Sequence, residues 1–358
     1  MKSYEKKTFL TEILSDDTVL PNSSAVREFK IGNDFFYSLD SESNFYKVNQ
    51  NIVNKVLSSI ELNSAAIAFR QGRSYYDFLE QHKNNYNFLR LDIKSYFHSI
   101  RLSHIKSSLE PYLKSGKSHR INNVDLLDYL LAYCTYQVPT TSSNTQFIDK
   151  TILPVGFPSS PVISNIVFRK IDIQIQKLCF ENNIIYTRYA DDMLFSSSEG
   201  DVLILNDEFE NKISQFLSTI ALKLNTHKTI RKKHTISLNG YVIEHSKVGG
   251  SIRLSNKKLH LINKITHYGL VKRETAEVIM NKLYKVNINN FQFRFGRDPH
   301  FFNKYCKDQL MNKISGYRSY LLSIIQFNKK NDCVHEDYLI KYSKIVNRLD
   351  RMLDVYGI

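Results

Sequence analysis

Two adjacent aspartates lie in a short turn between two apolar segments. Asp191 and Asp192 follow Tyr189 and Ala190, with Ile-Ile-Tyr-Thr-Arg before the turn and Met-Leu-Phe-Ser after it, and this order predicts a β-hairpin over residues 184–198. Neighbouring carboxylates repel each other, and burial raises their pKa unless a cation is bound. A rigid acidic turn of this kind therefore indicates a cation site.

A third carboxylate, Asp92, ends another apolar segment, residues 88–93, which we predict to be a buried strand. If this strand neighbours the hairpin, Asp92 and Asp191 meet at one point. Two divalent ions about 3.5–4 Å apart stabilise the attacking and leaving oxygens of a phosphoryl transfer, and Mg²⁺ prefers such oxygen ligands. The three aspartates therefore predict a phosphoryl-transfer site that holds two Mg²⁺ ions.

The elements that must position these carboxylates are helices and short strands in alternation. We expect residues 1–50 to be irregular, with a turn at Gly32 and Asn33, and residues 103–150 to be mostly helical. Apolar periodicity predicts further helices over residues 46–62, 75–82, 162–180 and 207–222. Asp172 and Lys177 are expected on the solvated side of the third of these. We expect a basic turn over residues 225–233, short strands over residues 235–243 and 251–254, and helices in the rest of the chain. This order of elements indicates an α+β sheet covered by helices on one face.

The composition favours a polyanionic partner. The 358 residues carry 49 Lys and Arg against 35 Asp and Glu, a net charge of +14, and residues 251–358 alone hold 20 basic and 9 acidic side chains. Four scattered cysteines without a CxxC pair argue against a zinc site or a disulfide framework. The first twenty residues include acids and no long apolar block, and no apolar run approaches a membrane span, so we expect a soluble cytoplasmic protein without a signal peptide.

Five segments in this order resemble the palm motifs of reverse transcriptases. They are Asp92 with Phe97, residues 153–161 (Leu-Pro-Val-Gly-Phe-Pro-Ser-Ser-Pro), Tyr-Ala-Asp-Asp at 189–192, Asn-Thr-His-Lys-Thr at 225–229, and Leu-Asn-Gly-Tyr at 238–241. The pattern is most similar to the prokaryotic retron-type group, which includes retron, abortive-infection and defence-associated enzymes. The retron C-terminal signature is not evident after residue 243, so a defence-associated relative is favoured over a true retron enzyme.

This resemblance implies a right-hand polymerase in three parts. Residues 1–88, with part of 103–152, would form the fingers. Residues 89–250 would form a palm with a ferredoxin-like sheet, and residues 251–358 a basic helical thumb.

The resemblance also implies roles for single residues. Asp92 and Asp191 would ligate both metals, with Asp192 as a weaker or second ligand, and Lys228 would deliver a proton or positive charge to the leaving pyrophosphate. Phe97 would be the steric gate that excludes a 2′-hydroxyl. Further residues are implied in contacts with the nucleotide (Gly156, Pro158) and with the primer end (Gly240, Tyr241).

Some positions depart from the family pattern. Val155 stands where many members have glutamine, so a direct template contact there is in question, and Ser95 replaces a frequent acid. The arginine expected in the fingers is missing from residues 34–39. Arg70 and Arg73, or else Arg27 and Lys30, are the candidates for holding the triphosphate.

In the C-terminal part, Lys313 and Arg318 lie on a predicted helix that suits sequence-independent phosphate contacts. Residues 291–297 (Phe-Gln-Phe-Arg-Phe-Gly-Arg) alternate aromatics and arginines. These aromatics suit either base stacking or core packing, and the sequence leaves both open.

The resemblance thus implies an RNA-directed DNA polymerase that extends a 3′-hydroxyl or a protein hydroxyl with deoxynucleotides. A non-coding RNA template and a role in defence against phage follow from the resemblance alone, and a partner protein or a second copy of the chain stays open. One rival is the same fold making DNA without a template, as in abortive-infection relatives. The other is a non-catalytic RNA-binding scaffold, which the clustered carboxylates disfavour.

Overall fold

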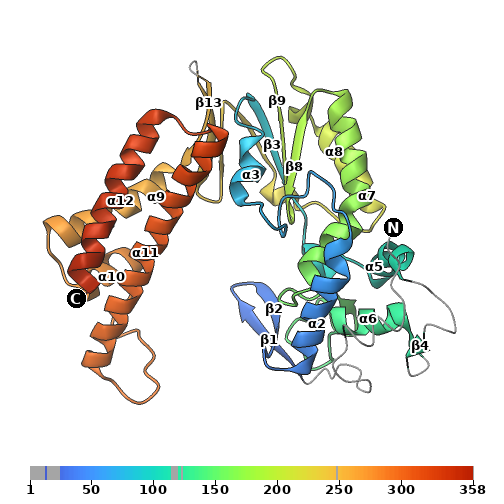
Figure 1. Ribbon diagram of the computed structural model, residues 1–358, viewed down its shortest axis with the longest axis horizontal. Helices are drawn as coiled ribbons and strands as arrows, with labels where there is room; N and C mark the ends of the chain where they lie inside the picture. The colour runs from blue at the N-terminus through green and yellow to red at the C-terminus, as the bar shows by residue number, and fades with distance from the viewer. Residues whose placement is uncertain (1–12, 14–24, 114–119, 122–123, 247–248, 358) are drawn as a thin grey trace. The chain divides into compact units, whose positions relative to one another are not determined.

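The computed structural model (Figure 1) describes residues 13, 25–113, 120–121, 124–246 and 249–357, so most of the stretch considered for a signal peptide lies outside it. The chain divides into two units. The first holds residues up to 78 together with 87–232, and the second holds residues 79–86 together with 233–358. Within the described residues, no helix combines the length and the apolar character that a membrane crossing requires.

The centre of the first unit is a four-stranded sheet in the order β10-β3-β9-β8. Its strands are β3 (Asn87–Asp92), β8 (Ile185–Tyr189), β9 (Asp192–Ser197) and β10 (Ile230–Lys233). The predicted strand at 88–93 and the predicted hairpin are confirmed, and β9 pairs with both β8 and β3 in antiparallel register. The basic turn expected at 225–233 is in part wrong, because its second half is the edge strand β10.

Helices cover this sheet, and α7 and α8 lie along one face of it in Figure 1. The helices and helical turns of the first unit are α2 (Asn44–Lys55), η2 (Leu57–Ser59), α3 (Tyr75–Glu80, which ends in the second unit), α4 (Tyr96–Ser99), α5 (Leu102–Leu109), η3 (Glu110–Tyr112), α6 (Leu126–Cys134), α7 (Ser160–Glu181), η5 (Leu203–Leu205), α8 (Asp207–Ser218) and η6 (Thr226–Lys228). Side chains from all of these helices except α3 and η6, together with side chains from β3, β8 and β9, form one apolar core.

Several helix limits differ from the sequence prediction for local reasons. Ser43 caps α2 by accepting a hydrogen bond from the Tyr46 amide, so the helix begins two residues early. It ends at Lys55, and the apolar residues beyond continue in the 3₁₀ turn η2. The mostly helical stretch expected at 103–150 also holds the short strands β4 (Arg120–Ile121), β5 (Val124–Asp125) and β6 (Tyr136–Gln137), the last of which pairs with β7 (Thr151–Ile152).

Residues 25–39 are not irregular. They form an antiparallel hairpin of β1 (Val26–Ile31) and β2 (Asp34–Leu39) around the predicted turn at Gly32 and Asn33. β2 contributes the buried side chains of Tyr37 and Leu39 to the core, whereas β1 packs against it through the partly buried Val26. Because both faces of β1 are largely exposed, its sequence lacks the alternation that marks a half-buried strand.

Gly156 lies against this hairpin. The Tyr37 amide donates to the Val155 carbonyl at 2.8 Å, and a Cβ added to Gly156 would lie 2.3 Å from the Tyr37 carbonyl oxygen, at a φ of +121°. We expect Gly156→Ala to lower the free energy of unfolding in urea by about 2–5 kcal/mol, from backbone strain plus the clash. Gly249→Ala is the matched control, since Gly249 has a φ of +126° and nothing within 4 Å of its added Cβ. Equal losses in the two variants would show that the contact with Tyr37 is unimportant.

The second unit combines a three-stranded sheet with helices. Its elements are β11 (Thr235–Leu238), β12 (Tyr241–Ser246), β13 (Gly249–Leu254), α9 (Asn256–Thr266), the π-helical turn η7 (His267–Val271), α10 (Ala276–Tyr284), α11 (Pro299–Asn331) and α12 (Glu336–Gly357). The strand expected at 235–243 is broken at Gly240 into β11 and β12, which pair with each other. Side chains on α9, α10 and the two long antiparallel helices α11 and α12 form a core of their own.

His82 is fully buried in the second unit, and burial lowers the pKa of its imidazole to about 3. As the pH falls through about 6.5, the unfolded chain takes up a proton on His82 that the folded state does not take up. The contribution of His82 to stability is therefore fully present above that pH and is lost as the pH falls towards 3. We expect a loss of about 1.4 kcal/mol per pH unit in this window. Urea unfolding between pH 7 and 4 measures it, and His82→Leu should remove this part of the slope; an unchanged slope would contradict the assignment.

Candidate active site

The structure brings the three predicted carboxylates together at one end of the central sheet. Asp92 and Asp192 are direct cross-strand partners between β3 and β9, and the Ile93 amide donates to the Asp191 carbonyl at 3.1 Å. Ala190 and Asp191 form the two-residue turn between β8 and β9, with Ala190 at a φ of +58°. A positive φ at the first turn position suits the twist of a tight hairpin, so the backbone holds Asp191 firmly.

Two cations already neutralise part of this charge. The Arg90 guanidinium donates to Asp192 Oδ1 from Nε at 2.9 Å and from Nη2 at 2.5 Å, and Lys228 Nζ donates to Asp92 Oδ2 at 3.1 Å. Asp92 is 3% exposed, whereas the Lys228 side chain is 56% exposed. Lys228 therefore reaches the carboxylate from the solvent side, where it can also meet a ligand.

Among the residues that the structure describes, no such cation is bonded to Asp191. Burial and the charges of Asp192 and Asp92 raise the pKa of its carboxyl to about 6, although Lys228 opposes the shift. Burial also raises the pKa of Asp192, against the effect of Arg90. The site thus holds more negative charge than its own cations balance.

This donor set suits a hard divalent cation, because it consists of carboxylate oxygens whose repulsion a bound ion would relieve. Within the described part of the chain, no group of three or more His, Cys, Asp and Glu side chains is arranged as a ready metal site. The bonds to Arg90 and Lys228 hold two of the three carboxylates in ion pairs.

Behind the turn lies a fully buried ion pair that the sequence analysis missed. Arg188 on β8 bonds to both carboxylate oxygens of Asp172 on α7, at 2.9 and 2.8 Å, and its Nη1 donates to the Ala190 carbonyl at 2.9 Å and the Tyr96 hydroxyl at 3.1 Å. Both charged side chains are 0% exposed, so the predicted position of Asp172 on the solvated side of its helix is wrong. The pair ties the acidic turn and the segment after Asp92 to α7.

A signal for this pair was present in the sequence. Arg188 stands inside an apolar strand and Asp172 inside a strongly apolar helix, and a buried charge requires an opposite partner. Neither element alone says which face is covered. The pairing follows only once β8 packs on α7.

Phe97, the predicted steric gate, lies in the first turn of α4 and is half-buried. Its ring makes edge contacts with Phe69 (centroids 6.1 Å apart) and with Tyr96 (5.1 Å apart). Phe69 is 44% exposed and has a φ of +61°. The two phenylalanines therefore form an aromatic pair partly open to solvent on the same unit as the carboxylates.

The candidate nucleotide-binding residues have different surroundings. Arg70 uses Nη1 to donate to the carbonyls of Asn63 and Ala66, so it braces its own loop. Arg73 forms an ion pair with Asp77 at 3.1 Å and keeps 48% of its side chain exposed. Pro158 lies in the turn before α7, and Pro161 is at the first turn of that helix, as the sequence predicts.

The predicted primer-grip and thumb residues lie in the second unit. Gly240 has a φ of +88°, and Tyr241 is 6% exposed with its ring 5.0 Å from that of Tyr320. Lys313 Nζ lies 4.1 Å from the centre of the Tyr284 ring, and Arg318 is paired with Asp350 on α12. Both cations therefore contact groups within the unit, and their contact with nucleic acid stays a prediction.

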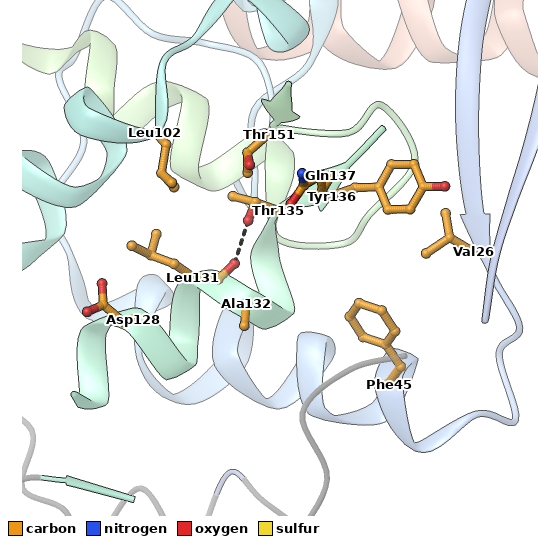
Figure 2. Close-up of a pocket in the computed structure, with 10 residues that line it drawn as sticks. All are labelled: Val26, Phe45, Leu102, Asp128, Leu131, Ala132, Thr135, Tyr136, Gln137 and Thr151. Carbon is orange, nitrogen blue, oxygen red and sulfur yellow. Dashed lines mark hydrogen bonds between the residues drawn. The ribbon is translucent and has the colours of Figure 1, made fainter. Parts of the chain in front are cut away.

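Two hollows in the first unit lie apart from the carboxylates. One of about 460 Å³ lies between Phe45, Leu131 and Tyr136, with Asp128 at its edge, and in it the Thr135 hydroxyl donates to the Leu131 carbonyl (Figure 2). The other, about 660 Å³, is lined in part by four cations, Lys94, Arg101, Lys150 and Lys223. Asp92, Asp191 and Asp192 line neither.

A protein-family model described as "Reverse transcriptase (RNA-dependent DNA polymerase)" matches residues 39–243, which is more than half of the chain and includes all three aspartates. The chain belongs to the reverse transcriptase family. The chain is thus an RNA-directed DNA polymerase with an α+β right-hand fold, as the resemblance implied.

Relatives refine this assignment to the prokaryotic retron type. This reverse transcriptase is 26% identical over 280 residues to the retron Ec83 reverse transcriptase of Escherichia coli, covering 76% of this chain and 82% of the relative. It is 25% identical over 261 residues to the retron Ec73 enzyme of the same species, covering 71% and 76%. Among solved structures, a telomerase from Candida albicans in complex with an RNA fragment matches with a TM-score of 0.46 and 11% identity, over 92% of this chain and 63% of that one.

Proposed function

We propose that this reverse transcriptase extends a primer hydroxyl with deoxynucleotides on a non-coding RNA template, uses two Mg²⁺ ions, and acts in defence against phage. The observation that carries the chemical part is the convergence of Asp92, Asp191 and Asp192, with a raised pKa at Asp191 that a bound cation would reverse. The biological part draws on the resemblance to defence-associated enzymes and on the retron relatives.

Asp92 and Asp191 would hold both ions, with Asp192 as a weaker or second ligand. When bound, the ions would neutralise charge on the phosphates and on the attacking and leaving oxygens. Asp192 is kept in place by Arg90, and its charge adds to the field at the site. Lys228, held beside Asp92 and open to solvent, would give a proton or its charge to the leaving pyrophosphate.

Residues around the carboxylates would select and position the nucleotide. We propose that the Phe97 ring, supported by Phe69 and Tyr96, excludes a 2′-hydroxyl from the sugar site. Arg73 is better placed than Arg70 to contact a triphosphate, since half of its side chain is exposed while Arg70 braces its loop. Gly156 and Pro158 would shape the loop that faces the incoming base pair.

The division into fingers (1–88 with part of 103–152), palm (89–250) and thumb (251–358) is also part of this proposal. Gly240 and Tyr241, near the end of the palm, would grip the primer end, and Lys313 and Arg318 in the thumb would contact duplex phosphates. Tyr241 supports this role through its rigid packing on Tyr320. A site in the cytoplasm, and a partner protein or a second copy of the chain, belong to the same expectation.

A primer-extension assay tests the proposal. With an RNA template, a DNA primer, four deoxynucleotides and Mg²⁺, we expect a product complementary to the template, and no product when EDTA replaces Mg²⁺ or ribonucleotides replace deoxynucleotides. Phe97→Ala should admit ribonucleotides. A product of equal yield without RNA would favour the rival in which the enzyme makes DNA without a template.

That rival rests on Val155, which replaces the glutamine of many relatives. The Val155 carbonyl accepts a hydrogen bond from the Tyr37 amide, so its backbone is engaged with β2. Val155→Gln offers a direct comparison: if template contact at this position matters, the variant should raise the yield of the templated product relative to any untemplated one. An unmodified protein that binds the RNA but yields no product in the primer-extension assay would favour the non-catalytic scaffold.

A further inference from the structure

The loop between α10 and α11, residues 285–298, has an exposed aromatic tip on an aromatic base. Its sequence left open whether Phe291, Phe293 and Phe295 stack on bases or pack in a core. The structure divides them: Phe291 and Phe293 are half-buried, whereas Phe295 is 91% exposed. Only Phe295 is therefore free to meet a partner with its ring.

The base of the loop is held by aromatic packing. The Phe291 ring lies 4.8 Å from that of Phe293, 5.4 Å from Phe302 and 4.7 Å from Tyr305, and Phe302 is fully buried on α11. Such ring contacts fix geometry as well as bury apolar area. The two inner phenylalanines therefore anchor the loop to α11.

Polar contacts hold the ends of the loop. Arg297 Nη2 donates to Asn289 Oδ1 at 3.0 Å across the loop, and the Asp298 carboxylate accepts from the His300 and Phe301 amides at the start of α11. Asp298 is the single acid in residues 285–298. Asp298 caps α11, and residues 285–298 keep a surplus of positive charge because Lys285, Arg294 and Arg297 outnumber this acid.

The tip itself combines a bare ring with cations. Arg294 lies 5.2 Å from the centre of the Phe295 ring, Arg297 follows two residues later, and both arginines are exposed. In Figure 1 the loop lies at the end of α11 opposite its junction with α12. A flat apolar ring beside two guanidinium groups suits a base with its flanking phosphates, because bases of any sequence stack on aromatics and arginine binds phosphate.

We propose that Phe295, Arg294 and Arg297 form a contact site for unpaired nucleotides of RNA, separate from the carboxylate site. The ring would stack on one base, and the arginines would bind neighbouring phosphates. We infer that the partner is a nucleic acid because the chain belongs to the reverse transcriptase family. We infer that it is single-stranded because the ring is exposed and needs a free base face, whereas the bases of a duplex are already stacked on each other. An acidic protein segment could use the arginines but would leave the ring without a flat partner.

The absence of tryptophan from the sequence makes a direct test available. Phe295→Trp places a single tryptophan at the tip, and stacking on a base should quench its fluorescence. The probe is an oligouridine of about eight nucleotides, within the usual site size for single-strand binding. Titration is done without Mg²⁺ or deoxynucleotides in full-length protein that also carries Asp191→Asn, so that a failure of the polymerase assignment does not affect the result.

We expect saturable quenching by the oligouridine, and little quenching by a blunt RNA duplex or by an abasic ribose-phosphate strand. Phe180→Trp is the matched control: Phe180 is 88% exposed on α7 without an arginine over its ring, and should not be quenched. Arg294→Gln with Arg297→Gln in the Phe295→Trp protein should weaken binding and lower the slope of log affinity against log salt by about 1.4, for two released counterions.

A competition experiment adds a loss-of-function readout. Phe295→Ala, at a position too exposed to disturb folding, should weaken binding of a labelled oligouridine about tenfold, as expected for one lost stacking contact. No quenching of the Phe295 tryptophan, equal quenching by the duplex, or equal quenching at Phe180 would each overturn the proposal. Unchanged affinity of the Phe295→Ala protein would overturn it as well.

Discussion

Asp191→Asn is expected to lower primer extension by about 10³-fold or more while making the metal-free protein more stable at neutral pH. The loss follows because this carboxylate would hold both ions, and metal ions contribute several kcal/mol to phosphoryl transfer. The gain follows because Asp191 is buried beside Asp192 and Asp92 without a bonded cation of its own. Asparagine keeps the shape of the side chain and removes the repulsion.

The pH dependence of stability separates these two effects. The pKa of Asp191 is raised from its ordinary 3.8 to about 6 in the folded, metal-free protein. The folded state therefore holds a proton on Asp191 that the unfolded chain releases. The contribution of Asp191 to stability is greatest at low pH and falls as the pH rises from about 4 to about 6. This loss is about 2–3 kcal/mol, and Asp191→Asn should not show it.

The measurements are single-nucleotide incorporation at saturating Mg²⁺ and urea unfolding in EDTA at pH 4.5 and 7. Asp207→Asn is the matched control, because Asp207 is 89% exposed and shares its partner Arg231 with Glu210. That change should alter stability by less than about 1 kcal/mol and leave incorporation intact. An Asp191→Asn protein that still extends primers would refute the assigned centre.

Breaking the Arg188–Asp172 pair is expected to cause a large loss of stability. Arg188→Met leaves Asp172 charged and fully buried, with the Tyr186 hydroxyl at 2.8 Å as its remaining hydrogen-bond donor of those described. A lone buried charge of this kind costs about 3–5 kcal/mol. Asp172→Leu should cost a similar amount, because Arg188 is then the uncompensated charge.

The double variant Arg188→Met with Asp172→Leu should recover most of this loss, since a buried ion pair is often replaceable by apolar residues of similar volume. Recovery stays incomplete because the Tyr186 and Tyr96 hydroxyls lose a partner. Urea unfolding of all four proteins gives the coupling energy. If the free energy of unfolding of each single variant fell by less than about 1 kcal/mol, the pair would not be important for stability.

The same double variant tests whether the pair positions the catalytic turn. Arg188 donates to the Ala190 carbonyl directly before Asp191, and to the hydroxyl of Tyr96 directly before Phe97. A folded double variant should therefore need more Mg²⁺ for half-maximal incorporation and should discriminate less well against ribonucleotides. Unchanged values for both would limit Arg188 to a stabilising role.

The sequence by itself determined the acidic site. The order of apolar strand, turn and apolar strand placed Asp191 and Asp192 in a hairpin, and the buried strand ending at Asp92 supplied the third carboxylate. Turn chemistry and strand periodicity are local properties, so a short window contains the information. The basic surplus in the C-terminal part is likewise a property of composition, and that part is the one that folds into the second unit.

Only the tertiary structure decided which faces are covered and which charges meet. Asp172 looked solvated along its helix and is buried, because β8 brings Arg188 against it. Arg90 pairs with Asp192, 102 residues away in sequence, and Lys228 pairs with Asp92, 136 residues away. Phe295 differs from Phe291 only in the residues that pack around it. A periodic pattern defines an apolar face but not its partner, and burial and pKa depend on that partner, so these features appear only once distant segments are packed together.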